Sequence, residues 1–484
     1  MFKKTLKTFF IILAFLLSFM AFFSGKWYYD IYGNIGFQSI LFTLLSPMEG
    51  TASDIVYSWL LRGLLPTVIF TLIAILLYFL LPKKCKVSDL FKKIVSIILC
   101  LCLWGYGATV TGIPTYLSGK LFETSIYENY YISPDSVKIT FPQKKQNLIY
   151  IYLESMETTY LSTKEGGGLS ENTIPELYNL ASQNLNFSHN NGIGGYGKVT
   201  STTWTSAAMV AHTSGVPLSL PIKYINPKKD SNFLPNIKTL TNILNKNGYY
   251  QALMFGSKAS YGGRGAYYSQ HSVDKIYDYY TAIKDKIIPK NYFVWWGFED
   301  YRLFDYAKTE LTKISAQEKP FAFTLLTADT HHIAGYKCKK CNSTYDSQYK
   351  NCISCSSKQV YEFIEWIKQQ DFYKNTTVII TGDHLSMDAK FFKDNMTNNF
   401  SRNVYNCFIN SKATTKNNKN RIFTPMDMFP TTLAAIGCEI EGERLGLGTN
   451  LFSQTPTLAE EIGIKKLNKE LNKKSTFYVE TFIN

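Results

Sequence analysis

Two side chains that bind metals, a carboxylate and an imidazole, stand next to each other at Asp383 and His384. They follow Gly382 and the β-branched run Thr376–Thr381, which is typical of a buried strand. Chemistry in open α/β sheets collects just beyond the carboxyl ends of the strands. Because divalent metals bind oxygen and imidazole donors, we predict a metal site here. A loop aspartate that caps the next helix, beside a surface histidine, is the simpler interpretation of the same dipeptide.

A second carboxylate, Glu154, directly follows the apolar run Asn147–Leu153. Two strand ends that carry acids can meet at one metal, although Glu154 could also cap or pair locally. The chain has six histidines, and His331, His332 and His384 all fall at the ends of predicted strands. A histidine near a metal can protonate a leaving oxygen or bind phosphate. We therefore expect His331 and His332 to belong to the same site.

Hydroxyl residues between Thr200 and Ser206 follow a glycine-rich loop and lead into an apolar segment, for which we predict a helix over Trp204–Ser214. Hydroxyl groups at a helix N-terminus can act only as caps. The same position offers backbone N–H groups and the positive end of the helix dipole to a phosphate. A threonine there becomes an activated nucleophile where a metal lowers its pKa.

Four of the nine cysteines form a C-x2-C-x10-C-x2-C pattern: Cys338, Cys341, Cys352 and Cys355. In an intracellular protein this spacing indicates a zinc site. Outside a membrane, disulfide bonds compete with zinc, and the sequence leaves both interpretations open. In either case we expect a structural cluster that holds the excursion after His331 and His332.

The elements that position these residues alternate in the βαβ manner, so we predict an α/β fold with a mostly parallel central sheet. The predicted strands are Asn147–Leu153, Tyr250–Phe255, Phe321–Leu326, Thr376–Thr381 and Val404–Ile409. The predicted helices are Ile174–Gln183, Trp204–Ser214, Asn236–Asn247, Tyr301–Ser315, Ser357–Gln369 and Met426–Ile436.

Three apolar segments near the N-terminus, at about 9–23, 64–81 and 94–110, approach the roughly 20 residues that cross a bilayer. We interpret the first as an uncleaved helix rather than a signal peptide. The apolar run Ile35–Leu45 is expected to lie at the outer interface. The resulting domain prediction is a transmembrane region at 1–112, a linker at 113–145, a catalytic domain at 146–455 and a C-terminal tail at 456–484.

Lysines precede the first apolar segment and gather again at 83–93, between the second and third. By the positive-inside tendency, both places are cytoplasmic, so three crossings put the chain after about residue 112 outside the plasma membrane. The net charge of +14 suits work beside anionic lipid or polymer, although a lysine-rich genome gives the same balance. No basic stripe with interleaved aromatic residues indicates a nucleic-acid partner.

With these motifs assembled, residues from about 147 to 453 resemble the alkaline phosphatase–sulfatase superfamily. Within it, the chain is similar to the lipoteichoic acid synthases and the membrane phosphoglycerol transferases. The motifs that carry the resemblance are Leu153-Glu154-Ser155, Thr202–Thr205, Gly215–Leu218, Trp296–Asp300, Asp329–His332, Gly382–His384 and Asp427–Thr431.

The resemblance implies that Glu154, Asp383 and His384 are metal ligands and that a nucleophilic threonine is the fourth. Counted back from the glycine and proline of Gly215–Leu218, this threonine is Thr205, with Thr202 as the alternative. The donors would accept Mn²⁺, Mg²⁺ or Zn²⁺, and the family implies Mn²⁺.

The resemblance also implies that His331 binds substrate, with His332 beside it, and that Arg264 contacts phosphate. Two positions depart from the lipoteichoic acid synthases: Gly262 replaces a tryptophan, and Ser257, which we also place at the substrate, replaces an aspartate. This loop is closer to the phosphoglycerol transferases that decorate glycans.

The activity implied is the transfer of glycerol phosphate from phosphatidylglycerol to an extracellular glycan or polyglycerol phosphate acceptor, through a covalent threonine intermediate. This would place the chain in biogenesis of the cell wall or envelope. Alternatives are phosphoethanolamine transfer or phosphodiester hydrolysis on the same scaffold, and a catalytically silent membrane protein that binds teichoic-type polymer. Sulfatase activity is disfavoured because no C/S-x-P-x-R sequence is present.

Overall fold

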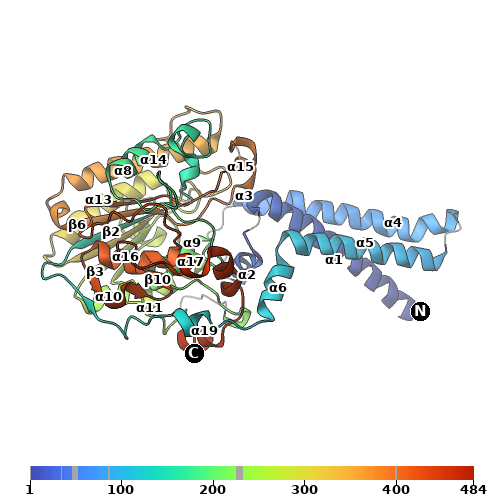
Figure 1. Cartoon of the computed structure of the whole chain (residues 1–484). Helices are drawn as coiled ribbons and strands as arrows, with labels where there is room; N and C mark the ends of the chain where they lie inside the picture. Colours follow the sequence, from blue (N-terminus) through green and yellow to red (C-terminus); the bar gives the residue numbers. More distant parts are fainter. Residues whose placement is uncertain (1, 34, 46–52, 86–87, 225–232, 398–399) are drawn as a thin grey trace. The chain divides into compact units, whose positions relative to one another are not determined.

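The computed structural model describes residues 2–33, 35–45, 53–85, 88–224, 233–397 and 400–484. They form two compact units, which Figure 1 shows in one view. The helical unit comprises Met1–Phe37, Thr51–Ser118 and Met387–Lys390. The sheet unit comprises Gln38–Gly50, Gly119–Ser386 and Phe391–Asn484, and so holds all the predicted site residues.

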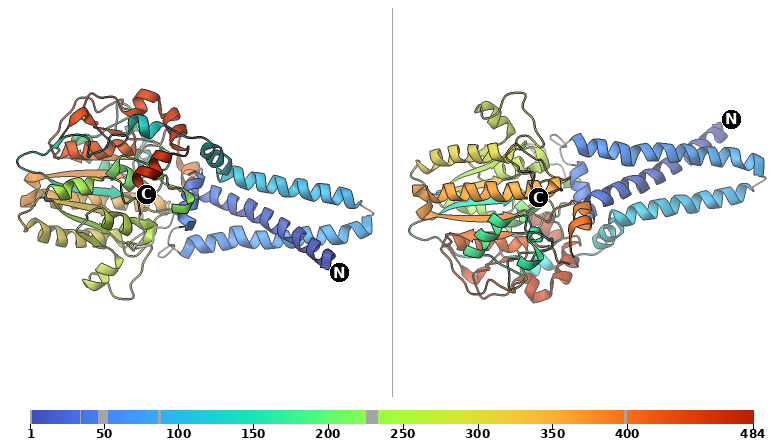
Figure 2. Two further views of the ribbon diagram at one scale, coloured as in Figure 1. Left: turned by 90° about the horizontal axis from the view of Figure 1, so that it is seen from below. Right: turned by 90° about the horizontal axis from the view of Figure 1, so that it is seen from above.

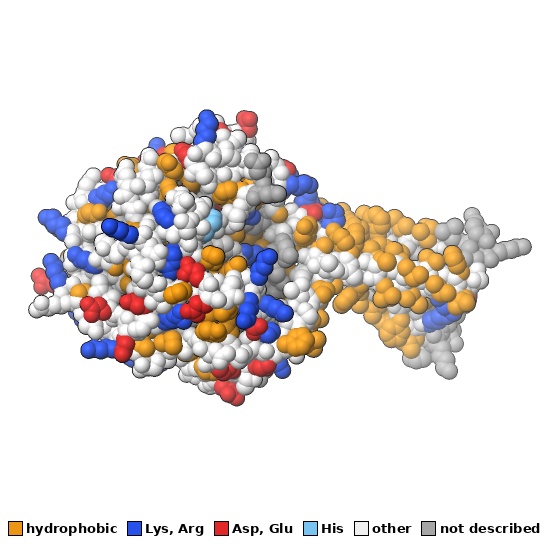
Figure 3. Space-filling view, viewed as in Figure 1, with side chains coloured by type: hydrophobic (Ala, Val, Ile, Leu, Met, Phe, Trp, Pro, Cys, Tyr) orange, Lys and Arg blue, Asp and Glu red, His pale blue; other side chains and the backbone are white. Residues whose placement is uncertain are grey.

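Three long helices make up most of the helical unit: α1 (Phe2–Tyr32), α4 (Leu65–Cys85) and α5 (Asp89–Val110). The stretches Thr5–Tyr32, Asp54–Phe79 and Asp89–Val110 are long and apolar enough to cross a membrane. Each is longer than the apolar segment predicted from the sequence. Hydrophobic side chains cover most of the visible face of these helices (Figure 3).

Small residues let α1 and α5 approach closely. A Cβ added to Gly107 would lie 2.3 Å from the carbonyl oxygen of Ala21, and one added to Gly25 would lie 2.9 Å from the Cα of Gly107. Close backbone contact through glycine and alanine is a common way for helices to pack in lipid, where burial of apolar side chains gives no advantage.

The sheet unit contains a six-stranded sheet in the order β4-β3-β5-β2-β6-β7. All neighbours run parallel except β7, which is antiparallel to β6. The strands are β2 (Asn147–Leu153), β3 (Tyr250–Phe255), β4 (Lys275–Tyr277), β5 (Phe321–Leu326), β6 (Thr376–Gly382) and β7 (Asn406–Ile409). The predicted fold class is confirmed.

Helices cover both faces of this sheet, as the views of Figures 1 and 2 show. One face carries α9 (Thr205–Ser214), α10 (Leu240–Lys246) and α16 (Met428–Ala435). The other carries α8 (Pro175–Gln183), α13 (Asp300–Ser315) and α14 (Gln348–Lys368). Because both faces are buried, β2 and β6 are buried at every position and are almost continuously apolar or β-branched in sequence.

The segment 456–484, which we expected to be a C-terminal tail, forms three helices: α17 (Leu458–Ile462), α18 (Ile464–Leu471) and α19 (Thr476–Phe482). Leu467 and Phe482 are fully buried in the core of the sheet unit. The segment 113–145, expected as a linker, contains α6 (Ile113–Lys120), α7 (Ile126–Tyr130) and the two-residue strand β1 (Ile139–Thr140).

The apolar run expected at the interface forms α2 (Phe37–Leu45). From Gln38 onward it belongs to the sheet unit. The Gln38 amide donates to the carbonyl of Leu218 over 3.4 Å and accepts from the hydroxyl of Ser201 over 3.0 Å. The buried ring of Phe42 lies 5.5 Å from that of Trp204, between ring centroids. This helix therefore packs beside the start of α9.

Candidate active site

Four side chains converge at the carboxyl edge of the sheet. Glu154 follows β2, Asp383 and His384 follow β6, and Thr205 is the first residue of α9. The Thr205 hydroxyl lies 3.2 Å from Glu154 Oε2 and 3.4 Å from His384 Nε2. His384 Nε2 in turn lies 3.3 Å from Asp383 Oδ2 and 3.6 Å from Glu154 Oε1.

Strand register places the two carboxylates together. Strands β2 and β6 are parallel neighbours with Leu153 opposite Gly382, so the residues that follow each strand emerge side by side. A Cβ at Gly382 would lie 2.0 Å from the carbonyl oxygen of Met156, so this close approach requires glycine. The backbone N–H of Ser155 donates to Asp383 Oδ1 over 2.8 Å and ties the two strand ends together.

Negative charge is concentrated around the His384 ring. Burial, followed by the charge of Glu154, raises the pKa of Asp383 to about 6. Burial alone would lower the pKa of His384, but Asp383 and Glu154 outweigh it, so the pKa of His384 is raised. His384 Nδ1 faces the carbonyl oxygen of Leu385 at 2.9 Å, which leaves Nε2 directed at the carboxylates.

This donor set fits a divalent metal ion. The ligand atoms of Glu154, Asp383 and His384 all lie within 4.8 Å of one another, and all three residues are buried. Asp383 Oδ1 accepts two backbone N–H groups, whereas the buried Oδ2 accepts no hydrogen bond from the residues that the structure describes. A cation at this point would balance the two buried carboxylates and would occupy the remaining oxygen.

The two candidate nucleophiles lie in different surroundings. Thr205 opens α9, where the backbone N–H groups of the first turn have no partner in the helix and can face a phosphate. Thr202 precedes the helix, and its buried hydroxyl donates to the carbonyl of Val199 over 3.1 Å. The structure thus brings Thr205, and not the Thr202 hydroxyl, against Glu154 and His384.

The two histidines after β5 stack on each other with ring centroids 4.4 Å apart. His331 Nδ1 lies 2.7 Å from the carbonyl oxygen of His332, so Nδ1 carries the proton and Nε2 is an acceptor. Burial lowers the pKa of His331 to about 4, and His384 is among the charges that lower it further. Burial, together with His331, lowers the pKa of His332 well below its usual range. Both rings are therefore neutral at neutral pH.

Arg264 lies buried under the loop that follows β3. Its Nη2 donates to the hydroxyl of Ser257 over 2.8 Å, and its Nε donates to the carbonyl of Tyr261 over 3.1 Å. Burial lowers the pKa of Arg264, while Tyr261 and the carboxylates of Glu154 and Asp383 raise it. Ser257 therefore holds the guanidinium, and the guanidinium faces the carboxylate side of the site.

Gly262 replaces the tryptophan expected from the resemblance, and the structure gives a steric reason for the glycine. This residue adopts φ +61°, and a Cβ there would lie 2.5 Å from the hydroxyl oxygen of Ser206. The Ser206 hydroxyl donates to the carbonyl of Gly262 over 2.8 Å, so the loop lies directly on the first turn of α9. A larger side chain at this position would force the loop away from the helix.

Two aromatic residues at this edge were not identified as site residues from the sequence. The rings of Tyr261 and Trp296 lie 5.0 Å apart, and those of Trp296 and His331 lie 4.4 Å apart. Together they form a wall from the Arg264 loop to the histidines. The available signal was the Trp296–Asp300 motif itself, which we used only for the resemblance.

An ion pair supports the segment after His384. Glu157 is fully buried, and Arg402 donates to it from Nε over 2.8 Å and from Nη2 over 2.5 Å. The Ser386 backbone N–H donates to Glu157 Oε1 over 2.9 Å, and its carbonyl accepts from Arg402 over 2.6 Å. This pair fixes the chain directly after Asp383 and His384.

Comparison with known proteins places this geometry in a family. The Sulfatase family model matches residues 146–438, more than half of the chain. The chain is 32% identical over 270 residues to phosphoglycerol transferase I of Citrobacter koseri, and the same figures hold for that of Escherichia coli. Each match covers 54% of this chain and 34% of the relative, so the chain spans about a third of the length of these relatives.

Two solved structures show the same fold. A protein in the alkaline phosphatase superfamily from Vibrio parahaemolyticus is 20% identical with a TM-score of 0.50, over 67% of this chain and 74% of that one. The integral membrane protein lipooligosaccharide phosphoethanolamine transferase A from Neisseria meningitidis is 13% identical with a TM-score of 0.50, over 89% of this chain and 84% of that one.

Proposed function

We propose that this chain, which belongs to the sulfatase family, transfers glycerol phosphate from phosphatidylglycerol to an extracellular glycan or teichoic-type acceptor. The observation that carries the proposal is the Thr205 hydroxyl, which opens a helix and lies within 3.4 Å of both Glu154 and His384. The 32% identity to phosphoglycerol transferase I of Citrobacter koseri supports the choice of glycerol phosphate.

The residues Glu154, Asp383 and His384, with the Thr205 hydroxyl, would hold a divalent metal ion, and we choose Mn²⁺ ahead of Mg²⁺ and Zn²⁺. When bound, such an ion would lower the pKa of the hydroxyl and offset the charge of the phosphate. The protein's own part is to hold the hydroxyl at the helix N-terminus and to present charge-matched donors around it.

In the first step, Thr205 Oγ1 forms a bond to phosphorus while the bond from phosphorus to the diacylglycerol oxygen breaks. The hydroxyl proton passes to Glu154 Oε2, 3.2 Å away. The phosphate anion raises the low pKa of His331, which takes up a proton from solvent at Nε2 and donates it to the departing diacylglycerol oxygen. The products are diacylglycerol and a phosphoglyceryl ester of Thr205.

In the second step, a hydroxyl of the acceptor attacks the same phosphorus, and the bond to Thr205 Oγ1 breaks. His331 Nε2, the acceptor nitrogen in the free site, takes the proton of the incoming hydroxyl. Thr205 regains its proton from Glu154. Throughout both steps, Arg264 and the N-terminal N–H groups of α9 bind the non-bridging phosphate oxygens.

Two headgroup-labelled lipids test the choice of donor. The purified full chain is incubated without acceptor and with Mn²⁺, in micelles that contain phosphatidylglycerol or phosphatidylethanolamine, each labelled in the headgroup. We expect one equivalent of diacylglycerol and labelled protein from phosphatidylglycerol alone. Labelling from phosphatidylethanolamine alone would replace the proposed substrate, and continuous release of headgroup without labelled protein would indicate a hydrolase.

A further inference from the structure

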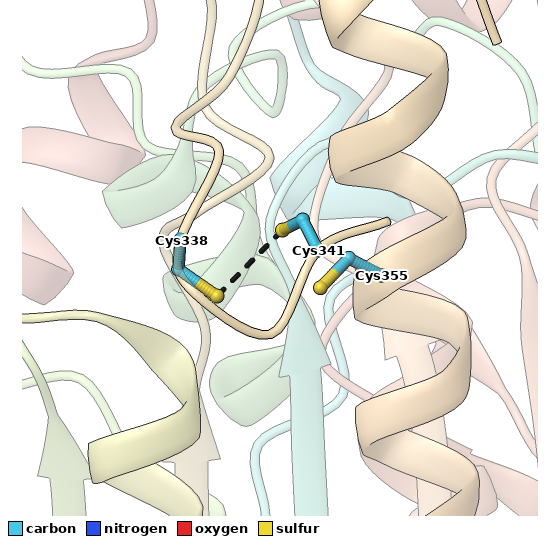
Figure 4. Close-up of side chains that lie close together, drawn as sticks. All are labelled: Cys338, Cys341 and Cys355. Carbon is cyan, nitrogen blue, oxygen red and sulfur yellow. Dashed lines mark hydrogen bonds between the residues drawn. The ribbon is translucent and has the colours of Figure 1, made fainter. Parts of the chain in front are cut away.

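Three cysteine thiols converge beside the active site but outside it. Cys338 and Cys341 come from the loop that follows the two histidines, and Cys355 lies on α14 (Figure 4). Their sulfur atoms all lie within 4.8 Å of one another, and those of Cys338 and Cys341 are 3.6 Å apart. All the cysteines whose side chains the structure describes are free thiols.

The convergence of three sulfurs fits a metal better than a disulfide. A Zn²⁺ ion binds thiolates at about 2.3 Å, so two sulfurs at the corners of a tetrahedron lie about 3.8 Å apart. A disulfide joins only two sulfurs, at about 2.05 Å, and does not draw a third toward them. The 3.6 Å between Cys338 and Cys341 is close to the tetrahedral edge.

Cys352 is the candidate for the fourth ligand, although its sulfur is not among the three that lie within 4.8 Å of one another. It lies three residues before Cys355, so both point from one face of α14. It is buried, and its thiol interacts with that of Cys341. The loop passes tightly over it, because a Cβ at Gly335 would lie 2.9 Å from the Cβ of Cys352 and 3.2 Å from its sulfur.

Hydrogen-bond donors surround the sulfurs, as thiolate ligands require. The side-chain amide of Gln359, one turn after Cys355 on α14, donates to its sulfur over 3.2 Å. The backbone N–H groups of Lys340 and Cys341 face the sulfur of Cys338. A pocket beside Cys355 is lined by charged residues of both signs: Asp305, Lys308, Lys340, Lys358 and Glu362.

We propose that Cys338, Cys341, Cys352 and Cys355 bind one Zn²⁺ ion that is separate from the metal at Glu154. Thiolates select zinc among the common divalent ions, and three sulfurs this close together leave room for a single ion rather than an iron–sulfur cluster. Zinc rather than paired disulfides therefore resolves the alternative that the sequence left open.

The ion would hold the loop 327–341 against α14. Within this loop, the Tyr336 backbone N–H donates to the carbonyl of Asp329 over 2.7 Å. Gln348, at the start of α14, donates to the carbonyl of Gly335 over 2.9 Å. Since His331 and His332 lie in the same loop, loss of the ion would loosen the segment that carries both histidines.

The test measures zinc in the full chain, purified in detergent without reductant or chelator. The Asp383→Ala variant lacks a ligand of the other site, so zinc that remains bound to this variant belongs to the cysteines. We expect about one zinc per chain in Asp383→Ala, its release by an organomercurial, and its loss when Cys355→Ser is added. Adding Cys438→Ala, a buried cysteine outside the cluster, should leave the zinc in place.

Alkylation of the unmutated protein tests the proposal even if Cys355→Ser fails to fold. Unmutated protein is denatured with chelator but without reductant, alkylated and mapped by mass spectrometry. Zinc predicts that all four cysteines of the cluster are alkylated, as Cys438 is. Four unreactive cysteines paired as disulfides, or a zinc-free Asp383→Ala chain, would overturn the proposal.

Discussion

At the scale of single residues, the hydroxyl groups near the start of α9 differ in what they contact. Thr205 faces Glu154 and His384, whereas the Thr202 hydroxyl is bound by its own turn. We expect Thr205→Ala to abolish both diacylglycerol release and the labelled adduct. Thr202→Ala should cost about 1 kcal/mol of unfolding free energy, the worth of one hydrogen bond, and should still form the adduct on Thr205.

Peptide mapping of the labelled protein checks this prediction, with circular dichroism of each variant as the control for folding. Label on Thr202, or an adduct that persists in Thr205→Ala, would move the nucleophile to the earlier hydroxyl.

The raised pKa of Asp383 gives metal binding a pH dependence. Its folded-state pKa of about 6 exceeds the ordinary 3.8, so the metal-free folded protein binds this proton more tightly than the unfolded chain does. The proton therefore stabilises the folded protein at low pH, and this stabilisation is lost as pH rises through about 6. Metal needs the charged form. We therefore expect Mn²⁺ affinity to fall by about tenfold per pH unit below 6 for each proton released.

The measurement is the difference in melting temperature with Mn²⁺ and with chelator, from pH 5 to pH 8. It should be small at pH 5 and should grow to a plateau above pH 6 to 7. Asp383→Asn is the control and should show almost no difference at any pH. A difference that stays constant across this range in unmutated protein would contradict the assignment of Asp383 as a ligand.

Some of these residues could be predicted from the sequence and others could not. Glu154, Asp383 and His384 directly follow apolar runs, so strand periodicity alone places them at one edge. The choice between Thr205 and Thr202 depends on where α9 begins, which a run of similar hydroxyl residues does not specify. The part played by Trp296 depends on packing between distant loops, which no local pattern records.

At the scale of elements, burial explains which strands and helices could be predicted from the sequence. Strands β2, β3, β5 and β6 are covered on both faces and are therefore made mostly of apolar or β-branched residues over six or seven positions. Strand β4 has three residues and only one buried position, too short to leave a pattern. Helix α14 begins at Gln348, whereas the predicted helix began at Ser357. The prediction missed the first turns because they carry cysteines in place of a regular apolar stripe.

Helix α2 provides a prediction at this scale. Phe42 is 3% exposed and packs on Trp204, which precedes Thr205, whereas Leu44 on the same helix is 64% exposed. Truncation of a buried phenylalanine lowers the free energy of unfolding by about 3 to 5 kcal/mol. The loss would be smaller here if the short helix α2 detached instead of leaving a cavity. We expect Phe42→Ala to lower both the melting temperature and the rate of diacylglycerol release.

Leu44→Ala is the matched control and should change unfolding free energy by less than about 0.5 kcal/mol. Both variants are measured in the same detergent by thermal unfolding and by lipid turnover. Equal effects of the two substitutions would show that the packing on Trp204 does not support the site.

The buried pair of Glu157 and Arg402 gives a second prediction for this scale. Removal of one partner leaves an uncompensated buried charge, which costs about 3 to 5 kcal/mol. We expect Arg402→Met to destabilise the sheet unit by about this amount and to weaken Mn²⁺ binding, because the Ser386 backbone that follows His384 loses its support.

The control for Arg402→Met is Lys368→Ala, which breaks the partly exposed pair with Glu365 and should cost less than about 1 kcal/mol. Chemical denaturation and Mn²⁺ titration measure both effects. Unchanged Mn²⁺ affinity in a destabilised Arg402→Met variant would show that the pair serves the fold alone.

At the scale of the whole molecule, the two units differ in surface chemistry. Exposed leucine, isoleucine and phenylalanine side chains line α1, α4 and α5, whereas lysine, arginine and acidic side chains are spread over the sheet unit (Figure 3). A long helix that exposes apolar side chains along its length requires lipid or a partner around it. The three candidate spans therefore support a membrane-anchored chain with a water-exposed sheet unit.

The distribution of lysines predicts the side of the membrane on which the sheet unit lies. Lysines cluster before the first candidate span and between the second and third, so these ends are expected in the cytoplasm and everything after the third span outside. Protease added to intact cells should therefore release a fragment that begins in the region 113–145 and contains the C-terminus. An epitope inserted between α4 and α5 should stay protected until the cells are permeabilised. If the fragment appears only after permeabilisation, the sheet unit is cytoplasmic, and an extracellular acceptor is excluded.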